Sequence, residues 1–209
     1  MGIRQKLRTW LLNNGQEHGL REIVQPVPKK ELTVIDNAQF HHLYKKGETD
    51  FRDCRFEGVD FSGVTLRNLD CRGSCFQAVK DLHRHSVNLA GADLSGANFS
   101  RMNLSGLDFS RSVLCNAIFV GTNLSRACFY EAQLDGVDFT KADLYWADLA
   151  GTQIRNAILN DANFECVDLY GANLDASVTG CNFTGARLPY GISFKKPEVA
   201  QKMRIFGEY

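Results

Sequence analysis

Residues 92–146 read ADLSG ANFSR MNLSG LDFSR SVLCN AIFVG TNLSR ACFYE AQLDG VDFTK ADLYW when they are written in groups of five. The third residue of every group is Leu or Phe, and the residue two positions earlier is usually small. A period of five suits neither an α-helix, whose fifth residues drift around the cylinder, nor a β-strand, whose fifth residues alternate faces. The chain therefore turns once per group. Each group forms a short extended leg and a corner, and the legs wind into a coil.

The pattern continues on both sides of this segment. From Val87 to Asp175, eighteen consecutive central positions hold Leu, Ile or Phe, which predicts that all of these side chains form the core. The same rule governs an earlier run in another register and a short later run. The earlier run has Phe51, Phe56, Phe61, Leu66, Cys71 and Phe76 at its centres, and the later run has Phe183 and Leu188.

Two irregularities interrupt the period. The step from Phe76 to Leu89 is thirteen residues, which is not a multiple of five, so an insertion is predicted within residues 77–86. The step from Leu174 to Phe183 is nine residues, one short of two repeats, which predicts a one-residue slip at Val178 and Thr179. The predicted organisation is an N-terminal helical and extended capping segment over residues 1–48, a repeat coil over 49–188 with an inserted loop at 77–86, and a C-terminal helical cap or dimerisation tail over 189–209.

The A-[DN]-[LF]-x-x pattern resembles the pentapeptide-repeat family over about residues 49–188. That resemblance implies a right-handed β-helix with four repeats per coil. The strict alternation of Leu and Phe independently favours an even number of legs, because four legs stack Phe99, Phe119 and Phe139 on one wall. Stacking like residues on like suits a densely packed interior. The predicted fold class is all-β, a right-handed quadrilateral (four-sided) β-helix with short helical caps at the N- and C-termini.

The two end segments predict covers for the open ends of the coil. Residues 2–13 have apolar residues at helical spacing, residues 32–35 resemble a short strand, and Val199, Met203 and Phe206 share a helical face. Open ends expose unpaired backbone and core, so they need covers that prevent end-to-end association. The sharper alternative is a homodimer through the C-terminal segment. The resemblance implies it, since family members that act on bacterial topoisomerases are dimers joined near their C-termini.

Charge and composition limit the classes of partner and the cellular compartment that we expect for this protein. The formal net charge is zero, which argues against general polyanion binding, although residues 87–190 hold eleven acidic residues against six basic ones. No run approaches the roughly eighteen apolar residues that span a bilayer. We find no signal peptide, and the seven scattered cysteines fit free thiols in a reducing compartment. We therefore expect a cytoplasmic protein, with secretion as an effector left open.

Catalysis is not indicated. The sequence has no paired catalytic constellation, phosphate loop or zinc-type spacing, and a densely packed core leaves no cleft of the kind that enzymes use. We predict neither enzymatic activity nor a cofactor. The inserted loop carries Asp81, His83 and His85, whose side chains are of metal-binding types but fit a solvated loop or a partner contact better.

Large aromatic residues break the rule for outward positions, which mostly hold Ser, Gly, Asp, Asn and Arg. With four legs per coil, two tyrosines share a wall and Trp146 lies at the corner above Arg126. Exposed Tyr, Trp and Arg are typical of a protein-binding hot spot. Alternatively, the rings lie flat on neighbours, or Trp146 merely stacks on Arg126. The candidate partner-binding residues are Tyr130, Tyr145, Trp146, Tyr170, Arg126, Asp148 and Asp168.

Three functions remain open on this basis. The first is a non-enzymatic scaffold that binds a protein partner through an outer wall or the inserted loop. The second, taken from the resemblance, is a DNA mimic that binds DNA gyrase or topoisomerase IV, for which a balance of minus five over the coil is a weak match. The third is a secreted bacterial effector that acts on host proteins. None of the three involves direct nucleic-acid binding.

Overall fold

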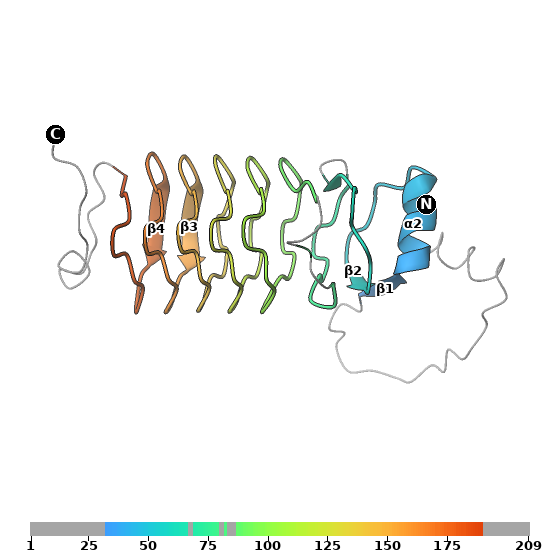
Figure 1. Cartoon of the computed structure of the whole chain (residues 1–209), viewed down its shortest axis with the longest axis horizontal. Coiled ribbons are helices and arrows are strands. Elements are labelled where there is room, and N and C mark those ends of the chain that lie inside the picture. Colours follow the sequence, from blue (N-terminus) through green and yellow to red (C-terminus); the bar gives the residue numbers. More distant parts are fainter. Residues whose placement is uncertain (1–31, 67–68, 80–81, 83–86, 190–209) are drawn as a thin grey trace.

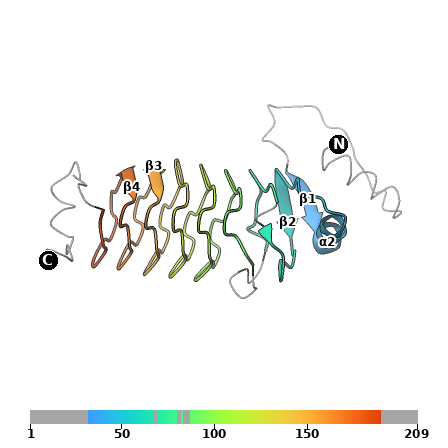
Figure 2. The same cartoon turned by 90° about the horizontal axis from the view of Figure 1, so that it is seen from above.

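The computed structural model describes residues 32–66, 69–79, 82 and 87–189 (Figure 1). The chain winds into coils that stack along one long axis, with a helix at the N-terminal end of the stack (Figures 1 and 2). Three predictions lie outside the described residues: the helix over residues 2–13, most of the inserted loop, and the helical face near residue 203.

Neighbouring coils are joined by parallel backbone bridges between residues twenty positions apart, such as Asp93 with Val113 and Asn98 with Ile118. Four five-residue repeats therefore complete one coil. Each coil also donates backbone hydrogen bonds to the next, as where the Phe119 N–H reaches the Asp138 oxygen at 2.8 Å. Legs that lie directly above one another form what we call a wall, with about 4.8 Å between successive coils.

Regular strands occur at two places along the coil. Strand β1 (Thr33–Asp36) pairs in parallel with β2 (Cys54–Glu57), and β3 (Gln153–Ile158) pairs in parallel with β4 (Asn173–Ser177). The short strand predicted at residues 32–35 is thus present, one residue later. Most other legs contribute isolated bridges, because the chain turns again after a few residues.

The predicted central residues form one continuous core. From Leu89 to Leu169 every one of them is fully buried, and Leu174 is partly buried. Rings stack on like rings from coil to coil: Phe119 lies 5.2 Å from Phe99 and 5.3 Å from Phe139, nearly parallel to both. The like-on-like stacking inferred from the alternation of Leu and Phe is confirmed.

The frequent Asp or Asn before each central residue has a local cause. Its side-chain oxygen accepts a hydrogen bond from the backbone N–H two residues later, as Asp108 does from Ser110 at 2.8 Å and Asn123 does from Ser125 at 3.0 Å. This is an Asx turn, which fixes the entry into the corner. The acidic residues of the coil therefore have a structural role that Asn also fulfils.

We expect Asp108→Ala to destabilise the protein by about 0.5–1 kcal/mol, because an exposed turn loses its side-chain acceptor. Asp108→Asn keeps an acceptor oxygen at the same place and should leave the free energy of unfolding nearly unchanged. Urea unfolding of both variants measures the difference. Equal losses in the two variants would mean that the negative charge, rather than the turn, selects this residue.

Helix α2 (Asn37–Lys45) is absent from the sequence prediction, which left this stretch inside a mixed segment. Asp36 and Gln39 form a reciprocal capping box that starts the helix. Phe40 is fully buried, with its ring centroid 5.1 Å from that of Phe51 and 4.8 Å from that of Phe61. The helix thus packs on the core of the first coil. The capping box followed by Phe40 was a signal that the sequence offered.

The two irregularities both appear in the register. Bridges across the insertion join residues 23 positions apart, as with Cys75 and Asn98, so the insertion adds three residues to one coil. Leu82 within it is fully buried. The one-residue slip was predicted too late, because the register between β3 and β4 already shifts between Asp175 and Ser177. The corner of that leg absorbs the missing residue, ahead of Val178.

Candidate protein-binding surface

Four aromatic residues lie exposed around one corner of the coil, and we call them the aromatic corner: Tyr130, Tyr145, Trp146 and Tyr170. Their exposed fractions are 40%, 37%, 61% and 46% respectively. The five-residue period explains their orientation, since each follows a buried central residue by one or two positions. The structure therefore places the aromatic residues that the sequence singled out on the outside of the coil, with the rings of Tyr145 and Trp146 next to one another.

Trp146 occupies a backbone position that bulky residues rarely adopt. Its φ is +58°, in the left-handed region. The equivalent corner holds Arg126 one coil earlier and Gly106 two coils earlier, and both also have positive φ. Left-handed backbone costs an L-residue about 1–2 kcal/mol. The Trp146 ring is mostly exposed, so it contributes little to the core. Ten other non-glycine residues of the described chain, Arg126 among them, have the same left-handed backbone, so this conformation belongs to the corners of the coil and the exposed ring is what sets Trp146 apart.

The structure agrees only in part with the alternative in which the rings pack on neighbouring residues of the same chain. The ring centroids of Tyr145 and Trp146 lie 6.4 Å apart in a tilted arrangement. Within the described part of the chain, no cation–π contact joins Trp146 to Arg126. The contact that is present involves a residue missing from the sequence prediction: the Arg187 guanidinium carbon lies 4.2 Å from the centroid of the Tyr170 ring.

Asp148, Asp168 and Arg187 form a column on the wall that carries Tyr130 and Tyr170, joined by bridges from Asp148 to Asp168 and from Asp168 to Arg187. Asp168 accepts a hydrogen bond from the Tyr170 N–H at 2.8 Å, and its other oxygen lies 3.2 Å from Arg187 Nη1. Arg187 thus contacts a carboxylate and a tyrosine ring together. The sequence hid this arrangement, because the register slip moves Arg187 one residue out of the expected frame.

Tyr130 belongs to a second polar group on the same wall. Arg111 Nε lies 2.9 Å from Glu131 Oε2. The pKa of Glu131 is lowered by a hydrogen bond from Tyr130 and then by Arg111, and the pKa of Tyr130 is raised by the same bond to Glu131. Glu131 therefore stays ionised at neutral pH and holds the tyrosine hydroxyl in place.

The inserted loop adds nothing to this surface that can be described. Asp81, His83 and His85 all lie outside the described residues. Elsewhere in the described ranges, no group of three or more His, Cys, Asp or Glu side chains is arranged to hold a metal ion. All seven cysteines are free. Burial raises the pKa of Cys181 to about 11, so this thiol stays protonated and unreactive at neutral pH.

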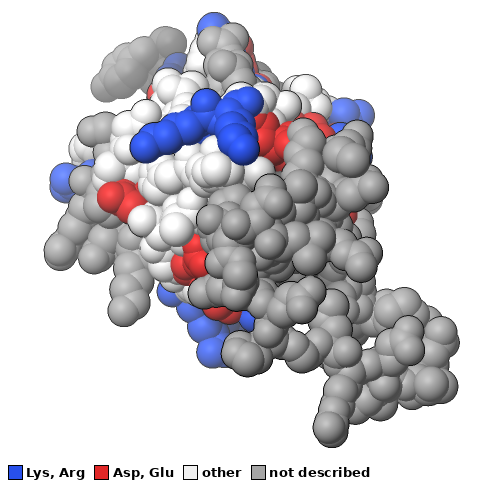
Figure 3. Space-filling model, turned by 90° about the vertical axis from the view of Figure 1, so that its right-hand side faces the viewer, with Lys and Arg blue, Asp and Glu red and all other residues white. Residues whose placement is uncertain are grey.

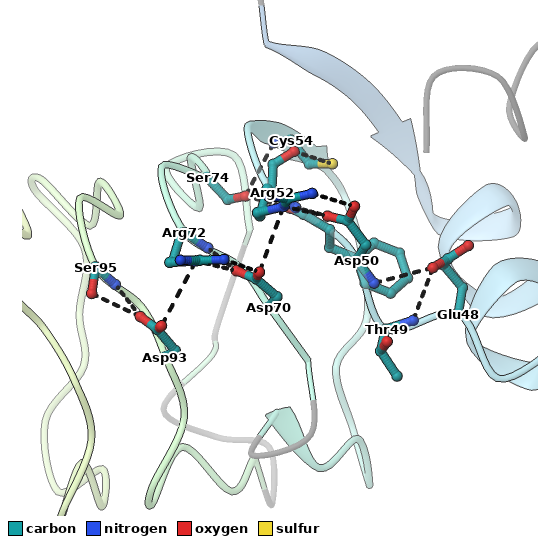
Figure 4. A network of polar contacts seen from close by, with 11 residues as sticks. Glu48, Thr49, Asp50, Arg52, Cys54, Asp70, Arg72, Ser74, Asp93 and Ser95 are labelled. Atoms are coloured by element: carbon teal, nitrogen blue, oxygen red, sulfur yellow. Dashed lines mark hydrogen bonds and ion pairs between the residues drawn. The ribbon is translucent and has the colours of Figure 1, made fainter. Parts of the chain in front are cut away.

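A ladder of ion pairs on a different wall was also missed by the sequence prediction (Figure 4). Asp50, Arg52, Asp70, Arg72 and Asp93 alternate in charge across three successive coils, with Arg72 Nη2 2.6 Å from Asp70 Oδ2 and Arg52 Nη2 2.8 Å from Asp50 Oδ2. The ladder could have been found from the repeated Asp-x-Arg spacing, which places both charges on the outward face of one leg.

The ladder supports the fold rather than a ligand site. Hydrogen bonds from Arg72 lower the pKa of Asp70. A lowered carboxyl pKa adds stability that is present above the unfolded-state pKa and is lost as pH falls through the folded-state pKa. Because the arginine side chains are about half exposed and Asp70 is 30% exposed, solvent screens these pairs and each contributes little. The end of the molecule near α2 likewise shows basic and acidic side chains interspersed (Figure 3).

The structure defines a class of protein: a β-helix built from five-residue repeats, with an inward core and an outward face free to vary. The family model for pentapeptide repeats matches residues 47–80, 85–119, 103–140 and 142–188, in eight copies. The chain belongs to the pentapeptide-repeat family. No curated protein sequence matches it significantly.

Three solved structures show what the chain is similar to. A pentapeptide repeat protein from the Arabidopsis thaliana thylakoid lumen is 33% identical over 54% of this chain and 75% of its own, with a TM-score of 0.28. HetL, involved in heterocyst differentiation regulation in the cyanobacterium Nostoc, is 23% identical over 69% and 74%, with a TM-score of 0.32. QnrB1, a plasmid-mediated fluoroquinolone resistance protein, is 20% identical over 72% and 84%, with a TM-score of 0.31.

Proposed function

We propose that this chain is a non-enzymatic scaffold that binds a protein partner through the aromatic corner. The observation that carries the proposal is Trp146, which at 61% is the most exposed large apolar side chain among the described residues. Tyr145 beside it and two further tyrosines on the adjoining wall extend the contact area. Trp, Tyr and Arg dominate binding hot spots, because they bury large areas at low entropic cost.

The proposal also includes the four-sided cross-section of the coil and the covers at its two ends. A four-sided cross-section follows naturally from four repeats per coil. Helix α2 is suited to cap the N-terminal end, because Phe40 and Leu43 are buried against the first coil. The C-terminal segment after residue 189 would cap or dimerise the other end. No described helix has the length and apolar character needed to cross a membrane.

The DNA-mimic alternative, with gyrase or topoisomerase IV as the partner, stays a prediction. It needs a long surface of unpaired carboxylates. Many carboxylates of the coil instead lie in ion pairs with arginine, as Asp135 does with Arg155 at 3.2 Å and Glu131 with Arg111. A DNA supercoiling assay tests this alternative directly. The second alternative, an exported effector, shares the protein-binding chemistry of our proposal and differs only in the compartment of the partner.

A comparison of two variants tests the proposal against the inserted loop. Once a partner has been isolated from the native cell, Trp146→Ala should weaken its binding by about 2 kcal/mol or more. Deletion of residues 80–85 should weaken binding less. Titration calorimetry measures both affinities, after thermal unfolding has shown that the variants are equally stable. Loss of binding on loop deletion, with Trp146→Ala unaffected, would place the function in the loop.

A further inference from the structure

Arginines of the described chain differ in whether the chain itself gives them a partner. Most of them form ion pairs with carboxylates of the coil: Arg52, Arg55, Arg72, Arg111, Arg155 and Arg187. Arg101 and Arg126 are exposed and form no ion pair with any described residue, and the same is true of Lys141. These three cations are therefore available to carboxylates of another molecule.

The three cations border a single wall, which we call the basic wall and which parallel bridges build from Asn103, Asn123 and Asp143. Arg101 and Lys141 lie at the corner where the chain enters this wall, and Arg126 lies at the corner where it leaves. Gly121 separates the two cations of the entry corner, and a Cβ there would lie 3.9 Å from Arg101 Cγ, so the arginine side chain passes beside the glycine. Two coil spacings, about 9–10 Å, separate the backbones of these two cations, which a few residues of extended peptide can span.

The face of the basic wall offers hydrogen-bond donors between the two corners. Asn123 uses its Oδ1 to accept hydrogen bonds from the Ser125 backbone N–H and hydroxyl, at 3.0 and 2.7 Å. No described residue accepts a hydrogen bond from the Asn123 Nδ2, so its two N–H groups remain for an acceptor outside the chain. Asp143 carries a negative charge on this face, where it accepts hydrogen bonds from Asn163 Nδ2 at 2.9 Å and from the Tyr145 N–H at 3.1 Å.

Acidic residues bound the basic wall and limit what it can bind. In the next coil, Asp161 follows Lys141 at the entry corner and Glu165 follows Tyr145 on the face. A nucleic acid carries phosphate charge along its whole length and would extend over these carboxylates, which disfavours it. A short run of acidic side chains fits three cations confined to three successive coils.

We infer that the basic wall binds a short acidic segment of the partner protein, whose Asp or Glu carboxylates pair with Arg101, Arg126 and Lys141. This inference rests on the proposed function and names the chemistry of its partner. Tyr145 lies on the same wall and Trp146 lies one coil above Arg126, so side chains next to the acidic run contact the aromatic corner. The charges then set the register and the association rate, while the rings supply most of the affinity.

The test titrates full-length, isotope-labelled protein with the peptide acetyl-Gly-Glu-Glu-Glu-Gly-amide at low ionic strength and follows backbone amide shifts by NMR. Amides of residues 101–105 and 121–126 should shift in a saturable way. Arg126→Gln should weaken binding about threefold, and replacement of all three cations by Gln about tenfold or more. Because these cations have no ion pair to lose within the described chain, the variants should unfold at the temperature of the parent protein.

Arg155→Gln is the matched control, because Arg155 lies on a different wall and pairs with Asp135 at 3.2 Å, and it should leave peptide binding unchanged. A peptide with Gln in place of Glu should not shift the same amides. Shifts that persist unchanged in the triple Gln variant, or that the neutral peptide reproduces, would overturn the inference. A short single-stranded oligonucleotide that binds these cations more tightly than the acidic peptide would also overturn it, in favour of nucleic acid.

Partner affinity separates this inference from the proposed function. If Trp146→Ala abolishes partner binding while the triple Gln variant binds the partner as tightly as the parent does, the proposed function stands and the acidic chemistry is wrong. Loss of partner binding in the triple Gln variant, with Trp146→Ala unaffected, would support the basic wall and contradict a site at the aromatic corner.

Discussion

Phe119→Asp should prevent the protein from folding. The Phe119 side chain is fully buried, stacked between two parallel rings and met edge-on by Phe109 and Phe129 at 6.0 Å. An aspartate there would be an unpaired charge among aromatic rings, which costs several kcal/mol. Because a domain is stable by only about 5–15 kcal/mol in total, we expect aggregation or loss of the cooperative transition in circular dichroism.

The neighbouring residue supplies the matched control. Ile118 occupies the outward slot in which most repeats have Asp or Asn, and it bridges to Asn98 and Asp138. Ile118→Asp introduces the same charge one residue away and creates the acceptor for an Asx turn, so it should stay folded within about 1 kcal/mol of the parent. If Phe119→Asp melted within a few degrees of the parent, the inward register would be wrong. Equal damage from both substitutions would also contradict it.

Trp146→Gly should change stability and binding in opposite directions. Glycine adopts a φ of +58° without strain, so the free energy of unfolding should rise by about 1 kcal/mol, or a few degrees in Tm. Partner binding should fall by about 2 kcal/mol or more, because the exposed ring is the centre of the proposed hot spot. A stabilising substitution that removes binding would show that the Trp146 ring is retained for binding rather than for the fold.

Asn156→Gly controls for the backbone effect. Asn156 is exposed and has a φ of +55° at a different corner, so the same change should also stabilise the protein, by less because asparagine tolerates left-handed backbone, and leave binding intact. Thermal unfolding and partner titration on the same preparations give both quantities. The account fails if Trp146→Gly binds as tightly as the parent, or if both glycine variants lose affinity equally.

Periodicity was sufficient to predict the core, because a five-residue rule fixes which side chains point inward without knowledge of their neighbours. The stack of Phe99, Phe119 and Phe139 results from that rule alone. The exposure of Trp146 and Tyr170 has the same origin. Features set by position within the repeat were therefore predictable.

Features that depend on contacts between coils were not predictable to the same degree. The partnership of Arg187 with Asp168 and Tyr170 requires the register after the slip, and the slip itself was placed too late. The ladder through Arg52 and Arg72 requires side-chain conformations that bring charges of successive coils together. Helix α2 has local signals in its capping box and in Phe40, but it lies outside the five-residue repeat from which the core was predicted.

Site-specific photo-cross-linking tests the central claim most directly. A photoreactive phenylalanine derivative placed at Tyr145, which is 37% exposed, should give one discrete adduct with the partner in the native cell. Excess parent protein should compete the adduct away, whereas excess Trp146→Gly protein should not. The same probe at Thr140, an outward position on another wall, should give no adduct. An adduct from Thr140 but not from Tyr145, or equal competition by both proteins, would contradict a partner site at the aromatic corner.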